Sequence, residues 1–244
     1  MIILGGGEFA NLIRKYDSYY HFSDEASHNT AIECMDILSK LVNDKVNSTK
    51  LAYTIDEAEK ISDNGFTPIF IVSEFLKNED PFECSWDVTS DSIAAYVAHS
   101  LNAKLLIVTN VNGIYTREPN EEGSEFINVI DAKKLLTFDE TSIDLMLPSL
   151  LLKFGSDCFV VNGKYPERVL SLIDDNIDNY NFDYTQIIGD LMKEVECISC
   201  KQEIPLTGPF VEFECPVCGA KIARCEKCRT FGHAYKCECG FVGP

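Results

Sequence analysis

The sequence predicts a three-layer αβα sandwich with a mostly parallel sheet, followed by a small C-terminal zinc ribbon. Helix-like and strand-like periodicities alternate through the first 190 residues, which is the order of consecutive βα units. Eight of the 11 cysteines lie in the last 48 residues, a density typical of a metal-binding module. We therefore expect an α/β domain over residues 1–190 and a zinc-ribbon domain over residues 195–244, joined near Asp190.

Charge and hydropathy argue against a membrane-spanning protein and against a general nucleic-acid-binding protein. No apolar run approaches the roughly 18 to 20 residues of a membrane helix, and the N-terminus shows neither a basic region nor a cleavage signature. A cytoplasmic protein without a membrane partner is expected. The formal charge of -18 argues against general affinity for nucleic acid. Residues 1–190 carry that charge, with 14 Lys/Arg against 32 Asp/Glu, whereas residues 191–244 hold seven of each.

The element pattern of the α/β domain can be stated by ranges. Apolar spacing predicts helices over residues 26–41, 55–62, 91–101 and 144–154. Strands are predicted at PIFIVS, KLLIVT and CFVVNG. In such sheets, ligands bind beyond the carboxyl ends of the strands.

Two polar, glycine-containing loops are candidate ligand sites. The strand that starts at Lys104 ends in Thr109-Asn110-Val111-Asn112-Gly113, after a helix that Thr89 or Ser90 can cap. The chain itself opens on four residues followed by Gly5, Gly6 and Gly7, whose backbone N–H groups no side chain shields from an anion. Both loops suit phosphate or nucleotide binding.

The stretch SDSIAAYVAHSLNAKLLIVTNVNGIYT resembles the amino-acid kinase superfamily. Members share a D-x-x-A-x-x-[IV]-A-x-x-L-x-A helix followed by L-I-x-L-T-D-V-x-G-[IV]-Y. GGGEFANLIRKYD resembles the family's second glycine loop with its helix, and CFVVNGKYPERV resembles its late strand, turn and helix. The resemblance covers nearly all of residues 1–190.

The resemblance implies ATP-dependent phosphoryl transfer with Mg²⁺ to a small-molecule acceptor. Asp91 matches the acidic residue that orders the phosphate-binding lysines; its alternative role is a helix-start carboxylate, and the surrounding motif favours the functional role. The residues implied in nucleotide binding are Thr109, Asn110, Gly113, Tyr115, Gly163 and Lys164. The residues implied in acceptor binding are Gly5, Gly6, Gly7, His28, Asp87 and Thr89.

Several of these assignments compete with simpler ones. Asn110 stands where many relatives carry Asp, so it offers hydrogen bonds without charge. Lys164 either touches a phosphate or is a solvated residue of a tight turn. His28 is an acceptor contact or, more simply, a helix-start histidine with a satisfied hydrogen bond. Trp86 is assigned to packing.

Finer details resemble an archaeal subgroup of the superfamily. They are Ser27-His28 before a helix, SWDVTSDSIAAY, IDLMLPSLL and VVNGKYPERV. That subgroup contains the kinase that phosphorylates an aminomethyl-furanmethanol phosphate in methanofuran biosynthesis, so this acceptor is the expected one. The alternative is a catalytically inactive nucleotide-binding domain with a zinc ribbon that binds RNA or protein.

Two lysine motifs of the family have no counterpart here. The first strand, K-x-G-G-S, is absent because the sequence begins at the second glycine loop, and G-M-x-x-K is not matched either. A lost cation weakens transition-state stabilisation, and a lost strand leaves a sheet edge or a gap. Three explanations remain: the natural chain extends upstream, which is slightly favoured; Lys15, Lys153 or Lys164 substitutes; or the domain binds nucleotide without turnover.

The tail carries four cysteine pairs, enough thiolates for one or two tetrahedral zinc sites. They are Cys197/Cys200, Cys215/Cys218, Cys225/Cys228 and Cys237/Cys239. Sequence order suggests that the first two pairs form one site and the last two another, with crossed pairing left open. Zinc is preferred over rubredoxin-like iron, and His233 is a less favoured replacement ligand.

The tail resembles small stand-alone archaeal zinc-ribbon proteins from about residue 195 to residue 244, with Cys237-Glu238-Cys239 one residue shorter than the usual knuckle. A small basic cluster and two aromatic residues suggest RNA or protein as partner; they are Lys221, Arg224, Lys227, Arg229, Phe231 and Tyr235. A homo-oligomer is also open.

Overall fold

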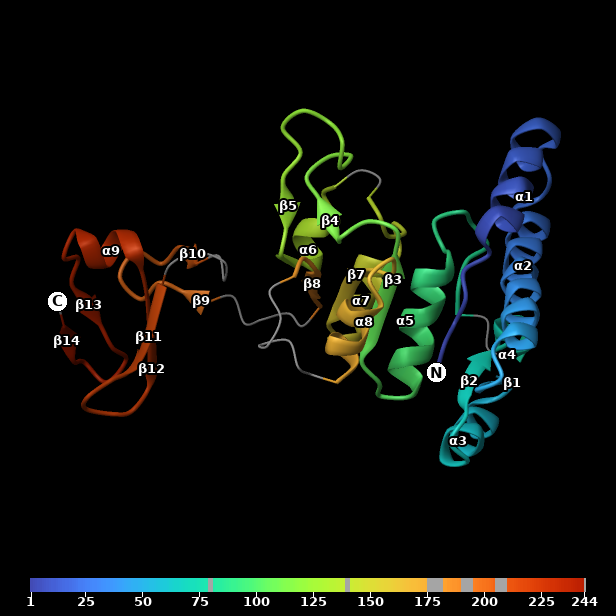
Figure 1. Ribbon diagram of the computed structural model, residues 1–244. Coiled ribbons are helices and arrows are strands. Elements are labelled where there is room, and N and C mark those ends of the chain that lie inside the picture. Colours follow the sequence, from blue (N-terminus) through green and yellow to red (C-terminus); the bar gives the residue numbers. More distant parts are fainter. Residues whose placement is uncertain (79–80, 139–140, 175–181, 190–194, 205–209, 244) are drawn as a thin grey trace. The chain divides into compact units, whose positions relative to one another are not determined.

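The computed structural model describes residues 1–78, 81–138, 141–174, 182–189, 195–204 and 210–243 (Figure 1). Backbone contacts divide the chain into two compact units, Met1–Asp190 and Leu191–Pro244. The junction predicted near Asp190 lies outside the described residues. Each unit is therefore described by itself.

The first unit alternates helices and strands as predicted. Its helices are α1 (Gly7–Tyr20), α2 (Asp24–Lys45), α3 (Ile55–Asp63), α4 (Val72–Asn78), α5 (Ser90–Ser100), α6 (Ala132–Leu135), α7 (Leu147–Phe154) and α8 (Pro166–Ile173). Its strands are β1 (Thr49–Ala52), β2 (Thr67–Phe70), β3 (Leu105–Thr109), β4 (Ile114–Tyr115), β5 (Phe126–Ile127), β6 (Val129–Asp131), β7 (Cys158–Asn162) and β8 (Thr185–Ile188).

The longer strands form a mostly parallel arrangement, as predicted. One sheet has the order β3-β7-β8-β6, in which β3 pairs with β7 and β6 with β8 in parallel, while β7 and β8 are antiparallel. β1 and β2 form a separate parallel pair, to which Ile2 adds a parallel bridge at Ile69. β3 is thus an edge strand of the larger sheet among the described residues, with Val108 half-exposed.

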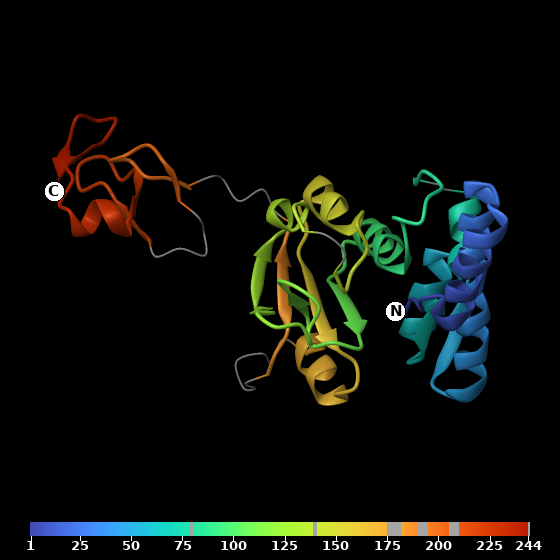
Figure 2. The same ribbon diagram turned by 90° about the horizontal axis from the view of Figure 1, so that it is seen from above.

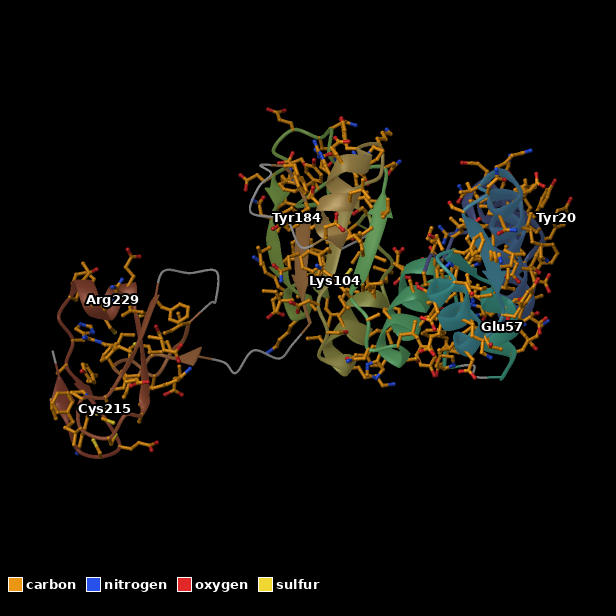
Figure 3. All side chains as sticks on the ribbon, turned by 60° about the horizontal axis from the view of Figure 1, so that its bottom comes forward. Tyr20, Glu57, Lys104, Tyr184, Cys215 and Arg229 are labelled. Atoms are coloured by element: carbon orange, nitrogen blue, oxygen red, sulfur yellow. The ribbon has the colours of Figure 1, made fainter. Side chains whose placement is uncertain are left out.

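Helices cover both faces of the four-stranded sheet, which gives the three layers. Figure 2 shows α5, α6 and α7 on one side and α8 on the other. Leu147, Leu151 and Val160 are fully buried in the core between α7 and the sheet. On the opposite face, Lys104 (Figure 3) lies over the Phe159 ring and donates to the Leu172 carbonyl at 3.0 Å, fixing the last turn of α8.

Helices α1 and α2 form an antiparallel hairpin at the start of the chain. A Cβ on Gly6 would lie 3.3 Å from the Ala31 carbonyl and 3.5 Å from Cys34 Cβ, so glycine permits close approach of the two helices. Ser23 caps α2 by accepting a hydrogen bond from the Ala26 N–H. The start of α1 is therefore held at a fixed place beside α2.

Two predicted boundaries were wrong for identifiable reasons. The PIFIVS run ends as a strand at Phe70, because the buried Asp36 carboxylate accepts the Val72 and Ser73 N–H groups and α4 begins there. The helix predicted from Asp144 starts at Leu147. Asp144 precedes the first turn, where its carboxylate accepts the Leu147 N–H.

The second unit is built from short hairpins. Its elements are β9 (Val195–Glu196), β10 (Glu203–Ile204), β11 (Phe210–Glu214), β12 (Lys221–Cys225), α9 (Glu226–Thr230), β13 (Tyr235–Lys236) and β14 (Val242–Gly243). Two small buried clusters each include cysteines: Cys215 and Cys237 pack with Ile222 and Tyr235, and Cys197 and Cys228 pack with Ile204. So little apolar burial cannot stabilise a unit of this size alone.

No helix within the described residues is both long and apolar enough to span a membrane.

Candidate functional site

The carboxyl ends of β3 and β7 meet at one edge of the sheet. Thr109 is level with Asn162 in the parallel pair, and the Gly163 N–H donates to the Thr109 carbonyl at 2.8 Å. A Cβ on Gly163 would collide with the Val108 side chain, which accounts for glycine in this turn. The predicted residues Thr109 and Gly163 therefore lie side by side.

A polar network joins the two loops that follow these strands. The Asn112 Oδ1 accepts from Asn162 Nδ2 at 3.0 Å and from Arg168 Nη1 at 3.2 Å, and Asn112 Nδ2 donates to Asp183 at 3.1 Å. Asn162 also accepts the Lys164 N–H at 3.0 Å. Sequence reasoning did not single out Asn112, Asn162 or Arg168, although each stands within a quoted motif.

The loop after β3 opens onto a cavity of about 280 Å³. Thr185 packs against this loop, because its hydroxyl accepts the Ile114 N–H at 2.8 Å and occupies the place where a Cβ on Gly113 would lie. The lining residues are Thr109, Asn110, Val111, Gly113, Tyr115, Arg117, Glu118, Pro119, Thr141 and Ser142. Four predicted nucleotide residues thus line one cavity, together with Arg117, which sequence reasoning missed although it follows Tyr115 by two positions.

The Asp144 carboxylate holds the starts of two helices. It accepts the Thr89 N–H and hydroxyl at 3.0 Å each, the Ser92 N–H at 2.9 Å and the Ser92 hydroxyl at 2.6 Å. It also accepts the Leu147 N–H at 2.8 Å. α5 and α7 are thereby held together at their N-termini by a residue that sequence reasoning used only as a subgroup feature.

Asp91 lies against this junction in the first turn of α5. Its Oδ2 accepts the Asp144 N–H at 3.3 Å. Burial of the carboxylate, reinforced by the negative charge of Asp144, raises the pKa of Asp91 to about 7. A carboxyl group with a pKa near neutrality, held in a rigid position, is typical of functional sites.

The glycine loop at Gly5–Gly7 lies next to the N-terminus of α5. A Cβ on Gly5 would be 3.1 Å from Ser90 Oγ, and Gly6 is the N-cap of α1 without a side-chain cap. Thr89, the N-cap of α5, directs its hydroxyl to Asp144 and not to the helix. The Ser92 N–H of α5 is already taken by Asp144, whereas the start of α1 has no side-chain cap, so an anion would be favoured at the α1 N-terminus.

The loop between α4 and α5 is fastened to the α1–α2 hairpin. Trp86 Nε1 donates to Asp17 at 2.8 Å, and the Arg14 guanidinium lies 4.9 Å from the Trp86 ring centre. The buried His28 places Nδ1 3.2 Å from the Ser85 carbonyl oxygen. These contacts favour the structural role for His28 and the packing role for Trp86, and Asp87 on the same loop is exposed.

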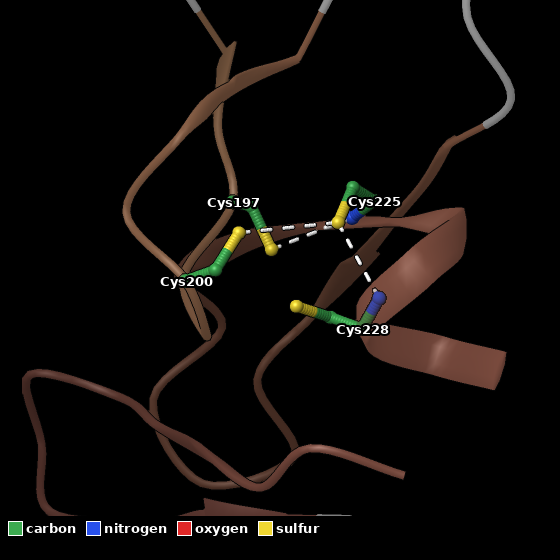
Figure 4. A group of neighbouring side chains, drawn as sticks. All are labelled: Cys197, Cys200, Cys225 and Cys228. Atoms are coloured by element: carbon green, nitrogen blue, oxygen red, sulfur yellow. Dashed lines mark hydrogen bonds between the residues drawn. The ribbon is translucent and has the colours of Figure 1, made fainter. Parts of the chain in front are cut away.

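The tail gathers its eight cysteines into two groups of four (Figure 4 shows the first). The groups are Cys197, Cys200, Cys225 and Cys228, and Cys215, Cys218, Cys237 and Cys239. The sequential pairing of neighbouring motifs was wrong. β11 and β12 form a hairpin with Cys215 and Cys218 at its turn and Cys225 at its open end, so adjacent motifs lie at opposite ends of it.

The sulfur atoms have the spacing of a tetrahedral metal site. Cys215 and Cys239 are 3.7 Å apart, Cys218 and Cys237 are 3.6 Å apart, and Cys200 and Cys225 are 4.0 Å apart. A tetrahedral ion with Zn–S bonds of about 2.3 Å requires sulfurs about 3.8 Å apart. Cys237 and Cys239 are separated by one residue and not by two, and their sulfurs fit this geometry as well as those of the C-x-x-C pairs.

Within the first group, the backbone favours the thiolate form of Cys197. Burial disfavours the charged form of Cys197, but the N–H groups of Cys225, Cys200 and Ser199 outweigh it and lower the pKa of Cys197 to about 6. The His233 Nδ1 lies 3.5 Å from Cys228 Sγ, outside the four-cysteine group.

The predicted basic cluster of the tail is smaller than expected. Arg224 and Tyr235 are both buried and pack on one another, with Arg224 also donating to the His233 carbonyl. Lys221 pairs with Glu212 at 3.7 Å. Exposed basic and aromatic groups remain on and after α9, at Lys227, Arg229 and Phe231.

Comparison with solved structures supports the architecture of the first unit. A uridylate kinase from Archaeoglobus fulgidus superposes with a TM-score of 0.55 at 19% identity, covering 75% of this chain and 81% of that one. At this identity the likeness concerns the fold alone.

The tail is similar to two groups of small proteins. The family model of ribosomal protein aS21 matches residues 197–240. A zinc finger protein from Haloferax volcanii is 45% identical over 51 residues, which is 20% of this chain and 83% of that protein.

The first unit has a close sequence relative of known activity. The [5-(aminomethyl)furan-3-yl]methyl phosphate kinase of Methanocaldococcus jannaschii is 36% identical over 190 residues, covering 78% of this chain and 83% of the relative. The model of the amino acid kinase family matches residues 1–155. The chain therefore belongs to the amino acid kinase family.

Proposed function

We propose that the first unit transfers the γ-phosphoryl group of ATP to a small phosphate-bearing acceptor, with an (aminomethyl)furanyl methyl phosphate as the leading substrate. The observation that carries this proposal is the 36% identity to the Methanocaldococcus jannaschii furan phosphate kinase, sustained over 190 residues. The likeness of the fold to a uridylate kinase would not by itself distinguish a furan phosphate acceptor from a nucleotide acceptor.

The geometry supports one division of roles. Thr109, Asn110, Gly113 and Tyr115 line the cavity at the end of β3 and would hold the nucleotide. Gly163 and Lys164, in the neighbouring turn after β7, would approach its phosphates. The rigid edge formed by two parallel strands keeps these groups in one place, as phosphoryl transfer requires.

The acceptor would bind where α1 and α5 begin. Gly5, Gly6 and Gly7 offer backbone N–H groups, and Asp87 and Thr89 lie on the adjoining segment. An acceptor phosphate would gain from the uncapped N-terminus of α1, while Asp91 lies in the first turn of the neighbouring helix α5. His28 would act by holding the Ser85 carbonyl and hence this segment.

Mg²⁺ would neutralise charge on the nucleotide phosphates, its usual position in kinases. Asp144 uses its oxygens on helix N-termini, and Asp91 is largely buried, so neither carboxylate fits direct coordination of a hydrated ion. Of the lysines considered as replacements for the family's motifs, Lys153 lies on the Phe154 ring and Lys15 is exposed on α1.

In the tail, each group of four cysteines would hold one Zn²⁺, which binds four thiolates in tetrahedral geometry. Metal binding would contribute most of the folding free energy of this unit.

A second candidate function, RNA binding by the tail, rests on the match to the ribosomal protein aS21 model. Lys227 and Arg229 on α9 carry exposed charge, and the Phe231 ring, 68% exposed, lies near the His233 ring at an angle of 30°. Such a surface suits a single-stranded segment that stacks a base on an aromatic ring.

The kinase assignment is tested by supplying Mg-ATP with [5-(aminomethyl)furan-3-yl]methyl phosphate or with UMP and measuring ADP. We expect acceptor-dependent ADP formation with the furan phosphate, faster than with UMP. Replacing Asn110 by Ala should weaken ATP binding by about tenfold, because the hydrogen bond from the Asn110 side chain to the nucleotide is lost. Nucleotide binding without ADP from either acceptor would instead identify a nucleotide-binding domain without turnover.

The Asp91→Asn variant separates activity from stability. Because the folded-state pKa of Asp91, about 7, exceeds the unfolded value, the wild-type fold loses stability as pH rises toward and through 7. We expect Asp91→Asn to unfold at higher urea than the wild type, with an advantage roughly 2 kcal/mol larger at pH 8 than at pH 5. Kinase turnover should fall by about a hundredfold.

Trp86, the single tryptophan, lies in the first unit and reports its unfolding by fluorescence. The exposed Asp87→Asn serves as control and should show no such dependence on pH. An Asp91→Asn variant that is less stable than the wild type at pH 8 would contradict the buried-charge argument.

The zinc pairing is tested by counting metal in double variants. The wild type should bind two Zn²⁺, one for each group. Cys200→Ser with Cys228→Ser disrupts a single group and should leave one ion, whereas Cys200→Ser with Cys218→Ser disrupts both. Elemental analysis of the purified proteins gives the counts, with Cys34→Ser as a control that keeps both ions; the reverse pattern would restore the sequential pairing.

For RNA binding, Arg229→Glu and Phe231→Ala should each weaken association with a single-stranded RNA, measured by fluorescence anisotropy. A loss of about 1–3 kcal/mol is expected for the stacked ring. Lys60→Glu makes the same change of net charge in the first unit and should have little effect. Equal losses for Arg229→Glu and Lys60→Glu, with no loss for Phe231→Ala, would indicate only general electrostatic attraction.

A further inference from the structure

Asn112 has a different role from its neighbours in the loop after β3. The other four residues of the stretch from Thr109 to Gly113 line the nucleotide cavity, and Asn112 does not. Its amide instead contacts three other segments: the end of β7 through Asn162, helix α8 through Arg168, and the segment before β8 through Asp183. These segments therefore hold the loop from the side opposite the cavity.

Arg168 is held in one orientation by aromatic rings. Its guanidinium carbon lies 4.1 Å from the centre of the Tyr165 ring and 6.0 Å from that of the Phe182 ring. Nη1 donates to Asn112 Oδ1 at 3.2 Å. Within the part of the chain that the structure describes, no carboxylate forms an ion pair with Arg168. The planar group is thus stacked on a ring and directed at the Asn112 amide.

Other contacts fasten the two ends of the loop. At its start, the Thr109 carbonyl accepts the Gly163 N–H at 2.8 Å. At its end, the Thr185 hydroxyl accepts the Ile114 N–H, also at 2.8 Å. Asn112 fastens the middle, because both its amide oxygen and its amide nitrogen are engaged. Loss of this contact would free the middle of the loop while both ends stay in place.

We propose that Arg168 is a positioning residue for the nucleotide, which holds the loop after β3, through Asn112, in the conformation that binds ATP. This inference rests on the proposed kinase function of the first unit. A loop that already has its binding conformation loses less freedom when the nucleotide binds. If the loop had that conformation for only about a tenth of the time, the apparent dissociation constant for ATP would rise about tenfold.

Calorimetric titration of the full chain with Mg-ATP, without an acceptor, tests the proposal. Arg168→Ala should raise the dissociation constant for ATP by about tenfold. In turnover assays it should raise KM for ATP, with kcat within about threefold of the wild type, because the bound state is unchanged. Damage to the fold would instead reduce the active fraction, which lowers kcat and leaves KM unchanged. Lys50→Ala removes a cation 3.8 Å from the Phe66 ring centre and is the matched control, with wild-type ATP binding expected.

Arg168→Lys separates position from charge. Lysine keeps the positive charge but lacks the planar group that stacks on Tyr165 and donates to Asn112 at the same time. We expect ATP binding to weaken by more than about fivefold, nearly as much as in Arg168→Ala. Wild-type affinity in Arg168→Lys would mean that the charge acts on the nucleotide directly, and would overturn the positioning role.

An exchange of side chains tests the contact at Asn112. Asn112→Asp places a carboxylate against Asp183, which now accepts from Asn112 Nδ2 at 3.1 Å, and should weaken ATP binding by at least about tenfold. Asp183→Asn keeps an acceptor oxygen and should stay within about threefold of the wild type. The double variant N112D/D183N reverses donor and acceptor, keeps the acceptor for Arg168, and should also return to within about threefold. A double variant as weak as Asn112→Asp would contradict the proposal.

Failure of this inference can be distinguished from failure of the kinase function. A wild type that does not bind Mg-ATP would overturn the proposed function and this inference with it. A wild type that binds Mg-ATP, with Arg168→Ala binding it equally well or showing only a lower kcat at unchanged KM, would overturn this inference alone. Because the titration needs no turnover, it decides the matter even for a domain that binds nucleotide without transfer.

Discussion

The candidate site depends on one partly buried junction, the Asp144 carboxylate between the starts of α5 and α7. Its oxygens accept hydrogen bonds from Thr89, Ser92 and Leu147, which belong to segments more than 50 positions apart in sequence. Helix N-termini leave N–H groups without intrahelical partners, so one carboxylate satisfies several of them and fixes both helices. This constraint fixes the position of α5, and therefore the position of Asp91 in its first turn. The start of α5 also brings Ser90 next to Gly5 of the glycine loop.

The sequence predicted local elements well where one pattern dominated. The run from Asp91 to Gly113 has a helical stripe, an apolar strand and a polar loop in unbroken order, and all three lie as predicted. The residues of the loop after β3 were predicted to lie together for the same reason, and four of them line one cavity. Asp144, Asn162 and Arg168 escaped notice as site residues because their partners come from distant segments, and spacing along the chain carries no information on such contacts. The prediction of which cysteine pairs share a site was wrong for a similar reason, because the grouping depends on which end of the β11–β12 hairpin each pair occupies.

The two units rely on different sources of stability. The first buries a continuous apolar core in which α7 packs on the sheet, so its fold does not need a ligand. The second has only small clusters, in which cysteines such as Cys215 and Cys228 account for much of the burial. Four unmetallated thiolates within 4.8 Å of one another would repel as they ionise, so the same atoms that stabilise the unit with metal destabilise it without metal. If each group of four cysteines holds Zn²⁺ as proposed, metal would be a condition for the fold of the tail and not for the fold of the first unit.

Asp91 shows how function can be inferred from an unfavourable interaction. Its carboxylate is buried beside the negative charge of Asp144, which is why the pKa of Asp91 lies near 7. For folding alone, an amide at this position would accept the Asp144 N–H equally well and avoid the cost of a buried charge. Under the proposed kinase function, a positive group brought to the start of α5 would favour the charged form of Asp91 and would release a proton at neutral pH. The buried charge of Asp91 is therefore a cost that the fold of the first unit does not require.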